Sequence, residues 1–267
     1  MKIATVTAAA SLIVICLGRA WAGSPDTALL EDLTWTELRD LAASKRLLII
    51  VPVGGTEQNG PHMTLGKHNV RVKALSERIA RALGNALVAP VIAYVPEGGL
   101  SPATAHMRFP GTITVPNETF QKVLEYAARS FKVHGVRDIV FLGDHGSTQA
   151  DQRAVAGRLN REWAATPTRV HAIDEYYRAA AVEFPRLLKT RGYGEAELGS
   201  HAGLTDTSLM LAVDPRMVRS GGPRPGPPEA SGVSGDPSRA TAELGQLGVE
   251  MIVTRTVDAI RKSIAHR

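Results

Sequence analysis

The sequence predicts a single α/β domain with a mainly parallel sheet. Short apolar runs typical of buried strands alternate along the chain with longer segments of helical periodicity. The 267 residues can bury a large core, and they contain no internal repeat. Only about 30 residues follow a Gly/Pro-rich segment at 220–238, too few for a second domain. We therefore expect that segment to be a long loop, of the kind that often covers an active site.

The first half of the chain alternates helix and strand. A short helix is expected to begin near Thr34, because Glu37 three residues later completes a capping box. Residues 47–53 are almost continuously apolar and end at two glycines, as expected of a strand buried on both faces. Helical spacing over 70–83 stops at a glycine, and 86–92 indicates a second buried strand.

The second half repeats this alternation. Apolar runs typical of strands are followed each time by amphipathic stretches of helical length, which favours parallel strand pairing. The expected strands are 112–115, 137–142 and 168–173, and the expected helices are 117–134, 149–165, 175–191 and 241–264.

The first 22 residues are expected to be a signal peptide. Lys2 gives a positive start, residues 3–18 are apolar or small, and Ala20-Trp21-Ala22 offers the small-x-small pattern of a cleavage site. The apolar run of about 16 residues is shorter than the roughly 20 of a membrane span, so a retained anchor is the less favoured alternative. We expect a periplasmic or secreted domain of residues 23–267, without membrane contact after cleavage.

Composition limits the chemistry of the mature chain. The single cysteine, Cys16, lies in the expected signal peptide, so a metal site must use His, Asp, Glu or Asn. The formal charge of +5 includes Lys2 and Arg19, and the remaining excess is too small and scattered to indicate nucleic-acid binding. With 44% hydrophobic and 21% charged residues, the chain is not largely disordered.

Polar residues collect in three segments, two of which directly follow expected strands. Because ligands of open parallel sheets bind beyond the carboxyl ends of the strands, these segments are candidates for one site. Four of the eight histidines lie in them, although each segment alone could also be a helix cap or a surface loop. Carboxylates and imidazoles together suit Zn, Mn or Fe(II). The candidates are Glu57, Asn59, His62 and His68, then Asp144, His145 and Ser147, then His201 and Asp206.

At these residues the sequence resembles the creatininase (creatinine amidohydrolase) family, from residue 47 to about residue 248. The resemblance implies a three-layer αβα fold, homohexamers, and a two-metal site that hydrolyses small, often cyclic, amides. The motifs that carry it are Pro-x-Gly-x-x-Glu-Gln-x-Gly-Pro-His at 52–62, His106 with Phe109–Thr112, His145–Gly146, His201–Gly203 with Asp206–Ser208, and Gly232–Pro237 with Ala240–Thr241.

The chain departs from the family at several ligand positions. The resemblance matches the first metal-binding glutamate to Glu57 and a ligand histidine to His145. The family's second ligand histidine is Asn59 here, and the aspartate that bridges both metals is His68. Ser147 stands where creatininase itself has a glutamate.

Two further family positions lie in the third segment. The glutamate of the His-Ala-Gly-x-x-Glu motif is shortened to Asp206, while His201 matches the histidine implicated in proton transfer.

Loss of the bridging carboxylate predicts a site with one metal. A neutral imidazole offers one lone pair to one metal, so two cations would repel with less anionic compensation. We therefore expect one divalent ion (Zn, Mn or Fe) held by Glu57, His68 and His145, with Asp206 or water completing the shell. His62 and Asp144 are reserve ligands, and a site without metal is the competing outcome.

The predicted function is an exported metal-dependent amidohydrolase that cleaves a C–N bond of a small amide, including cyclic ones, with a metal-bound hydroxide. Asp206 would orient the water or accept its proton, His201 would protonate the leaving nitrogen, and Asn59 would bind the oxyanion. Segment 220–238 and either Trp163 or Tyr176-Tyr177 could close over the substrate. The alternatives are an exported small-molecule-binding protein that has lost hydrolysis and an enzyme acting on a different C–N bond. Family likeness also implies a homo-oligomer.

Overall fold

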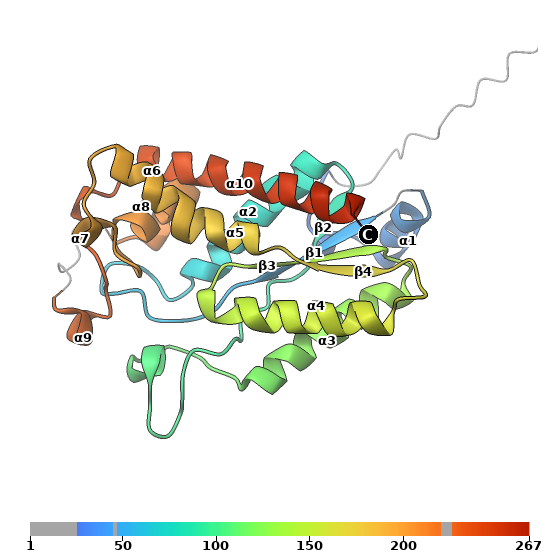
Figure 1. The fold of residues 1–267 in the computed structure, drawn as a ribbon, viewed down its shortest axis with the longest axis horizontal. Helices are drawn as coiled ribbons and strands as arrows, with labels where there is room; N and C mark the ends of the chain where they lie inside the picture. The colour runs from blue at the N-terminus through green and yellow to red at the C-terminus, as the bar shows by residue number, and fades with distance from the viewer. Residues whose placement is uncertain (1–25, 45–46, 220–225, 267) are drawn as a thin grey trace, which may run out of the picture.

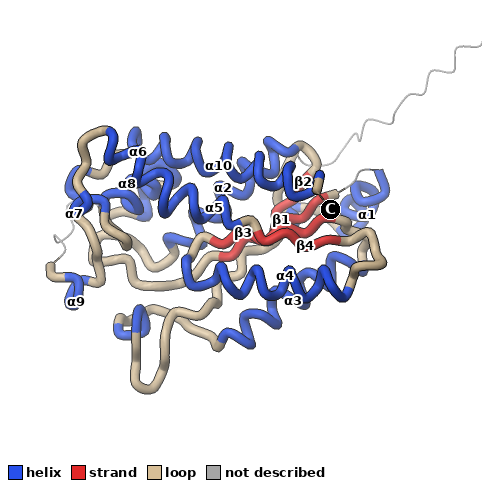
Figure 2. The backbone as a smooth tube through the Cα atoms, in the orientation of Figure 1, coloured by secondary structure: helices blue, strands red, loops and turns tan. Residues whose placement is uncertain are grey.

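The computed structural model describes residues 26–44, 47–219 and 226–266, so the signal peptide expected at 1–22 lies outside the described residues. A parallel sheet lies between two layers of helices, as the ribbon and the tube show (Figure 1, Figure 2). The expected αβα arrangement is confirmed. Among the described helices, none combines the length and apolar character that a bilayer span requires.

The sheet has four strands in the order β2-β1-β3-β4, and every pair is parallel. The strand expected at 86–92 ends at Val88, because Pro90 has no N–H to extend the ladder. Residues 112–115 form no strand and make one isolated bridge, between Val95 and Thr114. The strands are β1 (Leu48–Val53), β2 (Ala86–Val88), β3 (Asp138–Gly143) and β4 (Arg169–Ala172).

Helices cover both faces of the sheet (Figure 1). The helix expected at 175–191 is divided, since a π-helical turn at Ala179–Glu183 joins α5 to α6. On one face lie α2 (Lys67–Leu83), α5 (Asp174–Arg178), α6 (Phe184–Thr190), α8 (Leu204–Val213) and α10 (Ala242–Ala265); on the other lie α1 (Trp35–Ser44), α3 (Asn117–Val133) and α4 (Gln149–Glu162), while α7 (Glu195–Leu198) and α9 (Pro228–Ser231) are short.

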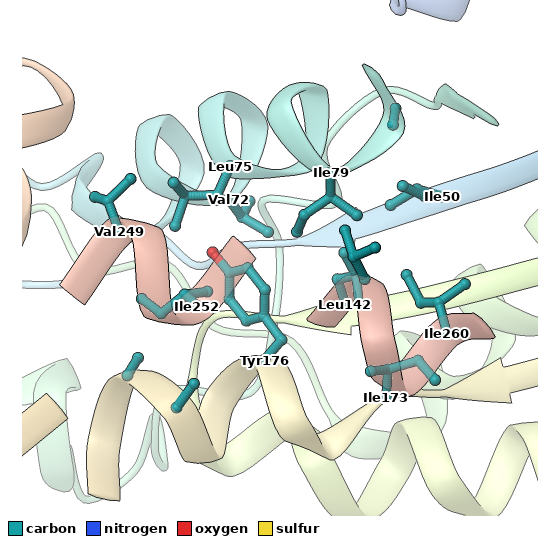
Figure 3. Close-up of a cluster of buried hydrophobic side chains, with 14 of the residues drawn as sticks. Ile50, Val72, Leu75, Ile79, Leu142, Ile173, Tyr176, Val249, Ile252 and Ile260 are labelled. Atoms are coloured by element: carbon teal, nitrogen blue, oxygen red, sulfur yellow. The ribbon is translucent and has the colours of Figure 1, made fainter. Parts of the chain in front are cut away.

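The central strands are buried on both faces, which explains their continuous apolar sequence. Ile50 of β1 and Leu142 of β3 face the core formed with α2 and α10, where they approach Ile79 and Ile260 (Figure 3). The next residue along β1, Ile49, faces the opposite core with α3 and α4. Alternate side chains of one strand thus enter different cores.

Helix α8 was not expected from the sequence, and its position depends on a close contact with α10. A Cβ atom at Gly245 of α10 would lie 1.8 Å from the carbonyl oxygen of Ser208 in α8. The absence of a side chain therefore lets the two helix backbones approach. This contact holds α8, which carries Asp206, against the rest of the helical layer.

We predict that Gly245→Ala lowers the free energy of unfolding by about 1–3 kcal/mol, because the added methyl group forces α10 away from α8. Gly157→Ala in α4 is the matched control: its Cβ would meet no atom nearer than 3.5 Å, at the end of Arg161. There the change should be neutral or stabilising by up to about 1 kcal/mol through helix propensity. Urea denaturation followed by circular dichroism measures both, and an equal effect at the two glycines would contradict the close contact.

Candidate metal centre

The polar segments meet because β1 and β3 are parallel neighbours in the sheet. Glu57 lies on the loop after β1, while Asp144 and His145 directly follow β3. The backbone N–H of Asp144 donates to the carbonyl of Val53 at 2.9 Å, which fixes the two loops side by side. The site therefore lies beyond the carboxyl ends of the strands, where ligands of such sheets bind.

A cavity of about 730 Å³ opens at this edge of the sheet. Its wall is strongly polar, with imidazole, carboxylate and cationic side chains from α2, α8 and the strand-end loops. The functional groups that line it include Lys67, His68, Arg71, His106, Asp144, His145, Tyr177, His201 and Asp206.

The fully buried carboxylate of Glu57 is the centre of the site, and its two oxygens face different partners. Oε2 lies 3.0 Å from Nε2 of His145 and 3.1 Å from Nε2 of His106. Oε1 lies 2.7 Å from Nε2 of His68 and 3.5 Å from Nζ of Lys67. Burial alone would raise the pKa of Glu57, but His68 and Lys67 hold it far below its usual range.

On the Oε2 side, Glu57, Glu97, His106 and His145 bring one potential ligand atom each to within 4.8 Å of one another. Glu97 is buried, and neither of its oxygens has a hydrogen-bond partner among the described residues. Burial and the charge of Glu57 raise the pKa of Glu97 to about 9. A buried carboxylate that has no hydrogen-bond partner in the described part of the chain and lies 3.3 Å from Nε2 of His145 fits a divalent cation.

The backbone makes room for Glu97. A Cβ atom at Gly55 would lie 2.6 Å from Oε1 of Glu97, and Gly55 also has a φ of +155°, which residues with side chains rarely adopt. A glycine after β1 is thus required for the carboxylate to reach the cluster.

Contacts of the other ring nitrogen orient each of the two histidines. Nδ1 of His145 accepts the backbone N–H of Ser147 at 3.2 Å and lies 2.7 Å from Oγ of the same residue, whose hydroxyl donates to the carbonyl of Pro96. Nε2 of His145 lies 3.0 Å from Oε2 of Glu57 and 3.3 Å from Oε2 of Glu97. The ring is therefore held with Nε2 toward both carboxylates, the orientation that a metal ligand requires.

The contacts of His106 fix its tautomer. Gln58 accepts the backbone N–H of Gly60 through Oε1 and donates from Nε2 to the carbonyl of Gly232, which fixes the orientation of its amide. Nε2 of Gln58 therefore also donates to Nδ1 of His106 at 3.1 Å. The proton of His106 is then on Nε2, so the ring can donate a hydrogen bond into the site.

The three residues expected from the sequence to hold the metal, Glu57, His68 and His145, do converge. However, His68 is enclosed by two carboxylates, because its Nδ1 lies 2.5 Å from Oδ1 of Asp144. Asp144 also accepts hydrogen bonds from Arg71 and from the hydroxyl of Tyr176. Both ring nitrogens of His68 are thus in hydrogen-bond contact with carboxylates of this chain.

Asp206, expected as a ligand or as the group that orients water, has both oxygens occupied. Oδ1 accepts from Arg71 at 2.8 Å, and Oδ2 accepts from Nζ of Lys67 and from the backbone N–H of Ala202, both at 3.0 Å. Burial opposes ionisation, but Lys67 and Arg71 hold the pKa of Asp206 well below its usual value. It is therefore a fixed counter-ion and a poor base.

Of the remaining site residues expected from the sequence, His201 lines the cavity, whereas Asn59 and His62 do not. Asn59 donates from Nδ2 to the carbonyls of Glu57 and Thr64, so its amide braces the loop; its buried Oδ1 has no partner among the described residues. His62 contacts the hydroxyl of Thr207. His201 lines the cavity, with Nε2 donating to the carbonyl of Gln58 and Nδ1 3.7 Å from Glu57.

Of the aromatic residues expected to close over the substrate, only Tyr177 lines the cavity. Trp163 is buried in the core against α3, and Tyr176 is buried with its hydroxyl on Asp144. Tyr177, by contrast, lines the cavity. The described part of segment 220–238 pairs with the His201 loop, since Ser234 donates to the carbonyl of His201 and lines the cavity wall.

Sequence reasoning missed Glu97, Lys67 and Arg71. Glu97 is a lone carboxylate before two glycines, with no histidine within several residues. Lys67 and Arg71 have the spacing of one helix face, which alone indicates a solvated surface. Their proximity to His68 was the available signal. The group of potential ligand atoms found among the described residues includes Glu97 and contains neither His68 nor Asp206.

Fold and site together define a class, that of hydrolases with a divalent metal centre at the edge of an αβα sheet. The family model described as creatininase, creatinine amidohydrolase, matches residues 31–260. The chain therefore belongs to the creatininase family, whose members are metal-dependent hydrolases.

Individual relatives agree with this assignment. The creatinine amidohydrolase of Pseudomonas putida is 27% identical over 255 residues, which cover 86% of this chain and 95% of the relative. The mycofactocin precursor peptide peptidase of Mycolicibacterium smegmatis is 29% identical over 243 residues, which cover 80% of this chain and 85% of the relative.

Solved structures extend the likeness to the fold. A crystal structure of creatininase superposes with a TM-score of 0.74 at 25% identity, over 90% of this chain and 99% of that one. A glutamate-to-glutamine variant of creatininase, of the Zn–Zn type, superposes with a TM-score of 0.73 at 26% identity. The superposition covers 90% of this chain and 99% of the variant.

The raised pKa of Glu97 predicts how stability of the metal-free protein depends on pH. In the unfolded chain this carboxyl ionises near its ordinary value of 4.5, whereas the folded protein keeps the proton until about pH 9. Between these values the folded state binds more protons, so this group's contribution to stability falls as pH rises. Glu97→Gln mimics the neutral acid and should be more stable than the wild type, with a difference that grows from pH 6 to pH 9.

Urea denaturation of both metal-free proteins at several pH values measures this difference, which should exceed about 1 kcal/mol at pH 9. Glu118→Gln, at an exposed position in α3, is the matched control and should show no such trend. A constant difference between Glu97→Gln and the wild type would show that Glu97 is ionised in the folded protein.

Proposed function

We propose that this protein is an exported amidohydrolase that uses one divalent metal ion (Zn, Mn or Fe) to hydrolyse a C–N bond of a small amide. The observation that carries the proposal is the group of Glu57, Glu97 and His145, of which His145 lines a polar cavity. Export is supported by the sequence pattern of residues 1–22. Mature residues 23–267 would form the working domain.

We assign three residues as ligands. Glu57, Glu97 and Nε2 of His145 would hold the ion, and three protein ligands leave a position open for substrate or water, as in catalytic metal sites. When bound there, a divalent ion supplies a Lewis acid that polarises a carbonyl and lowers the pKa of water. The carboxylates and the imidazole are donors suited to Zn, Mn and Fe.

Hydrogen bonding to the developing oxyanion falls to His106 in this proposal. Its Nε2 proton, fixed by Gln58, points into the cluster, 3.1 Å from Oε2 of Glu57. Asn59 was expected in this role, but its amide nitrogen donates to two backbone carbonyls. A preorganised donor at the site of developing charge is an effective form of catalysis.

Proton transfer to the leaving nitrogen is assigned to His201. Burial and the charge of Lys67 lower its pKa to about 3, so the ring is neutral before the reaction. Because Nε2 donates to the carbonyl of Gln58, the Nδ1 lone pair is the acceptor that faces Glu57. His201 would hold the proton at Nδ1 only transiently and give it up readily to the leaving nitrogen, because its low pKa makes the protonated ring a strong acid.

The cavity and the relatives support a small substrate. A volume of about 730 Å³ suits a compact molecule, and the relatives named above act on creatinine and on a precursor peptide.

We also propose a homo-oligomer. Exposed apolar side chains on and beside α3, among them Tyr94, Val123 and Tyr126, support an association surface.

Hydrolysis of a panel of lactams, cyclic ureides and short open-chain amides tests the proposal. We expect turnover of at least one compound by the metal-loaded protein, and a loss of roughly 100-fold or more in kcat/KM for His145→Ala, because even outer contacts of a metal site cost up to about 100-fold. His134→Ala, at the exposed end of α3, is the matched control and should retain activity.

A second result would overturn the assignment of this protein as an enzyme. If no compound is hydrolysed, yet the protein binds panel members equally well with and without His145, the chain is an exported binding protein. Metal content measured on the same preparations distinguishes a protein that lacks its ion from a panel that lacks the right substrate.

A further inference from the structure

The Oε1 side of Glu57 is filled by side chains of this chain. Lys67 is one of its largest fully buried side chains, with 1% of its surface exposed. Burial of an ammonium group costs free energy unless anionic partners compensate it. The Nζ atom has two such partners, Asp206 at 3.0 Å and Glu57 at 3.5 Å.

Two further basic side chains, His68 and Arg71, each contact two of the neighbouring carboxylates in the same way. His68 lies between Glu57 and Asp144, and Arg71 joins Asp144 to Asp206. Glu57, Asp144 and Asp206 therefore each contact two of the three basic side chains. The acids on this side of the site are already neutralised by fixed groups of the protein.

We propose that Lys67, supported by His68, permanently occupies the place of a second metal cation, so that the site combines one divalent ion with one built-in ammonium group. This inference rests on the proposed function, because it assumes an ion on the Oε2 side of Glu57. The glutamate-to-glutamine variant of creatininase named above is of the Zn–Zn type. Here the ammonium contacts Glu57 on the side opposite His145.

Two physical reasons exclude a second ion. An ammonium group has no lone pair, so it cannot coordinate a metal, and it repels one placed against the same carboxylate. His68 blocks the approach to Oε1 as well, since its Nε2 contacts that oxygen at 2.7 Å. Lys67 thus supplies positive charge at a fixed position, independent of metal supply.

The test is Mn²⁺ binding by equilibrium dialysis with metal analysis, together with electron paramagnetic resonance of the bound ions. The wild type should saturate at one equivalent and give the spectrum of isolated Mn²⁺. Lys67→Met with His68→Asp removes two basic groups and restores a carboxylate. This double variant should bind two equivalents with an exchange-coupled spectrum, the second at least about 100-fold tighter than any second ion in the wild type.

Controls make the result specific to Lys67. Lys189→Met removes a lysine that lines the same cavity but pairs with Glu195, so it should leave the stoichiometry at one. Should the double variant not fold, as judged by circular dichroism, Lys67→Met alone provides the test. It should bind a second Mn²⁺ at least about tenfold tighter than the wild type does.

The outcomes separate this inference from the proposed function. Two equivalents in the wild type, or a folded variant that gains no affinity for a second ion, would overturn the role of Lys67 and leave the hydrolase intact. No bound metal in the wild type would overturn both.

Discussion

The buried carboxylate of Glu57 is the group on which the site depends, because its two oxygens serve two different environments. Oε2 faces the imidazoles of His106 and His145, and Oε1 faces His68 and Lys67. An isolated carboxylate at this depth would be protonated and could not bind a cation. The basic side chains keep it ionised, so they create the metal side of the site without belonging to it. The fold makes this possible by placing the loops after β1 and β3 next to each other.

The same arrangement explains how so many charges are tolerated below the surface. Acids and bases alternate in the site, and Glu57, Asp144 and Asp206 each contact two basic side chains, which repays part of the cost of removing ions from water. Glu97 is the exception, since its pKa is raised to about 9 and its oxygens have no hydrogen-bond partner among the described residues. A group that is unfavourable in the metal-free protein but favourable with a cation marks function rather than stability. Asp206 reaches the network from α8, whose backbone lies close to that of α10.

Much of the fold could be predicted from local patterns, and part of the site could not. The central strands and the long helices followed from apolar periodicity, and Glu57 and His145 followed from their place after strands. Helix α8 is apolar on most sides, so it has no stripe to indicate it, and the π-helical turn within 175–191 leaves no periodic signal. Glu97 comes from a loop after an edge strand, and only tertiary structure brings it to Glu57. The pairing of Lys67 with Asp206 joins residues 139 positions apart, which no local pattern reveals.

Anomalous diffraction from crystals soaked with Mn²⁺ or Zn²⁺ tests the central claim most directly. We predict one anomalous peak per chain, bounded by Glu57, Glu97 and His145, with Lys67 and His68 still against the other oxygen of Glu57. A peak coordinated by His68 and Asp206, or a pair of peaks on both sides of the Glu57 carboxylate, would contradict it.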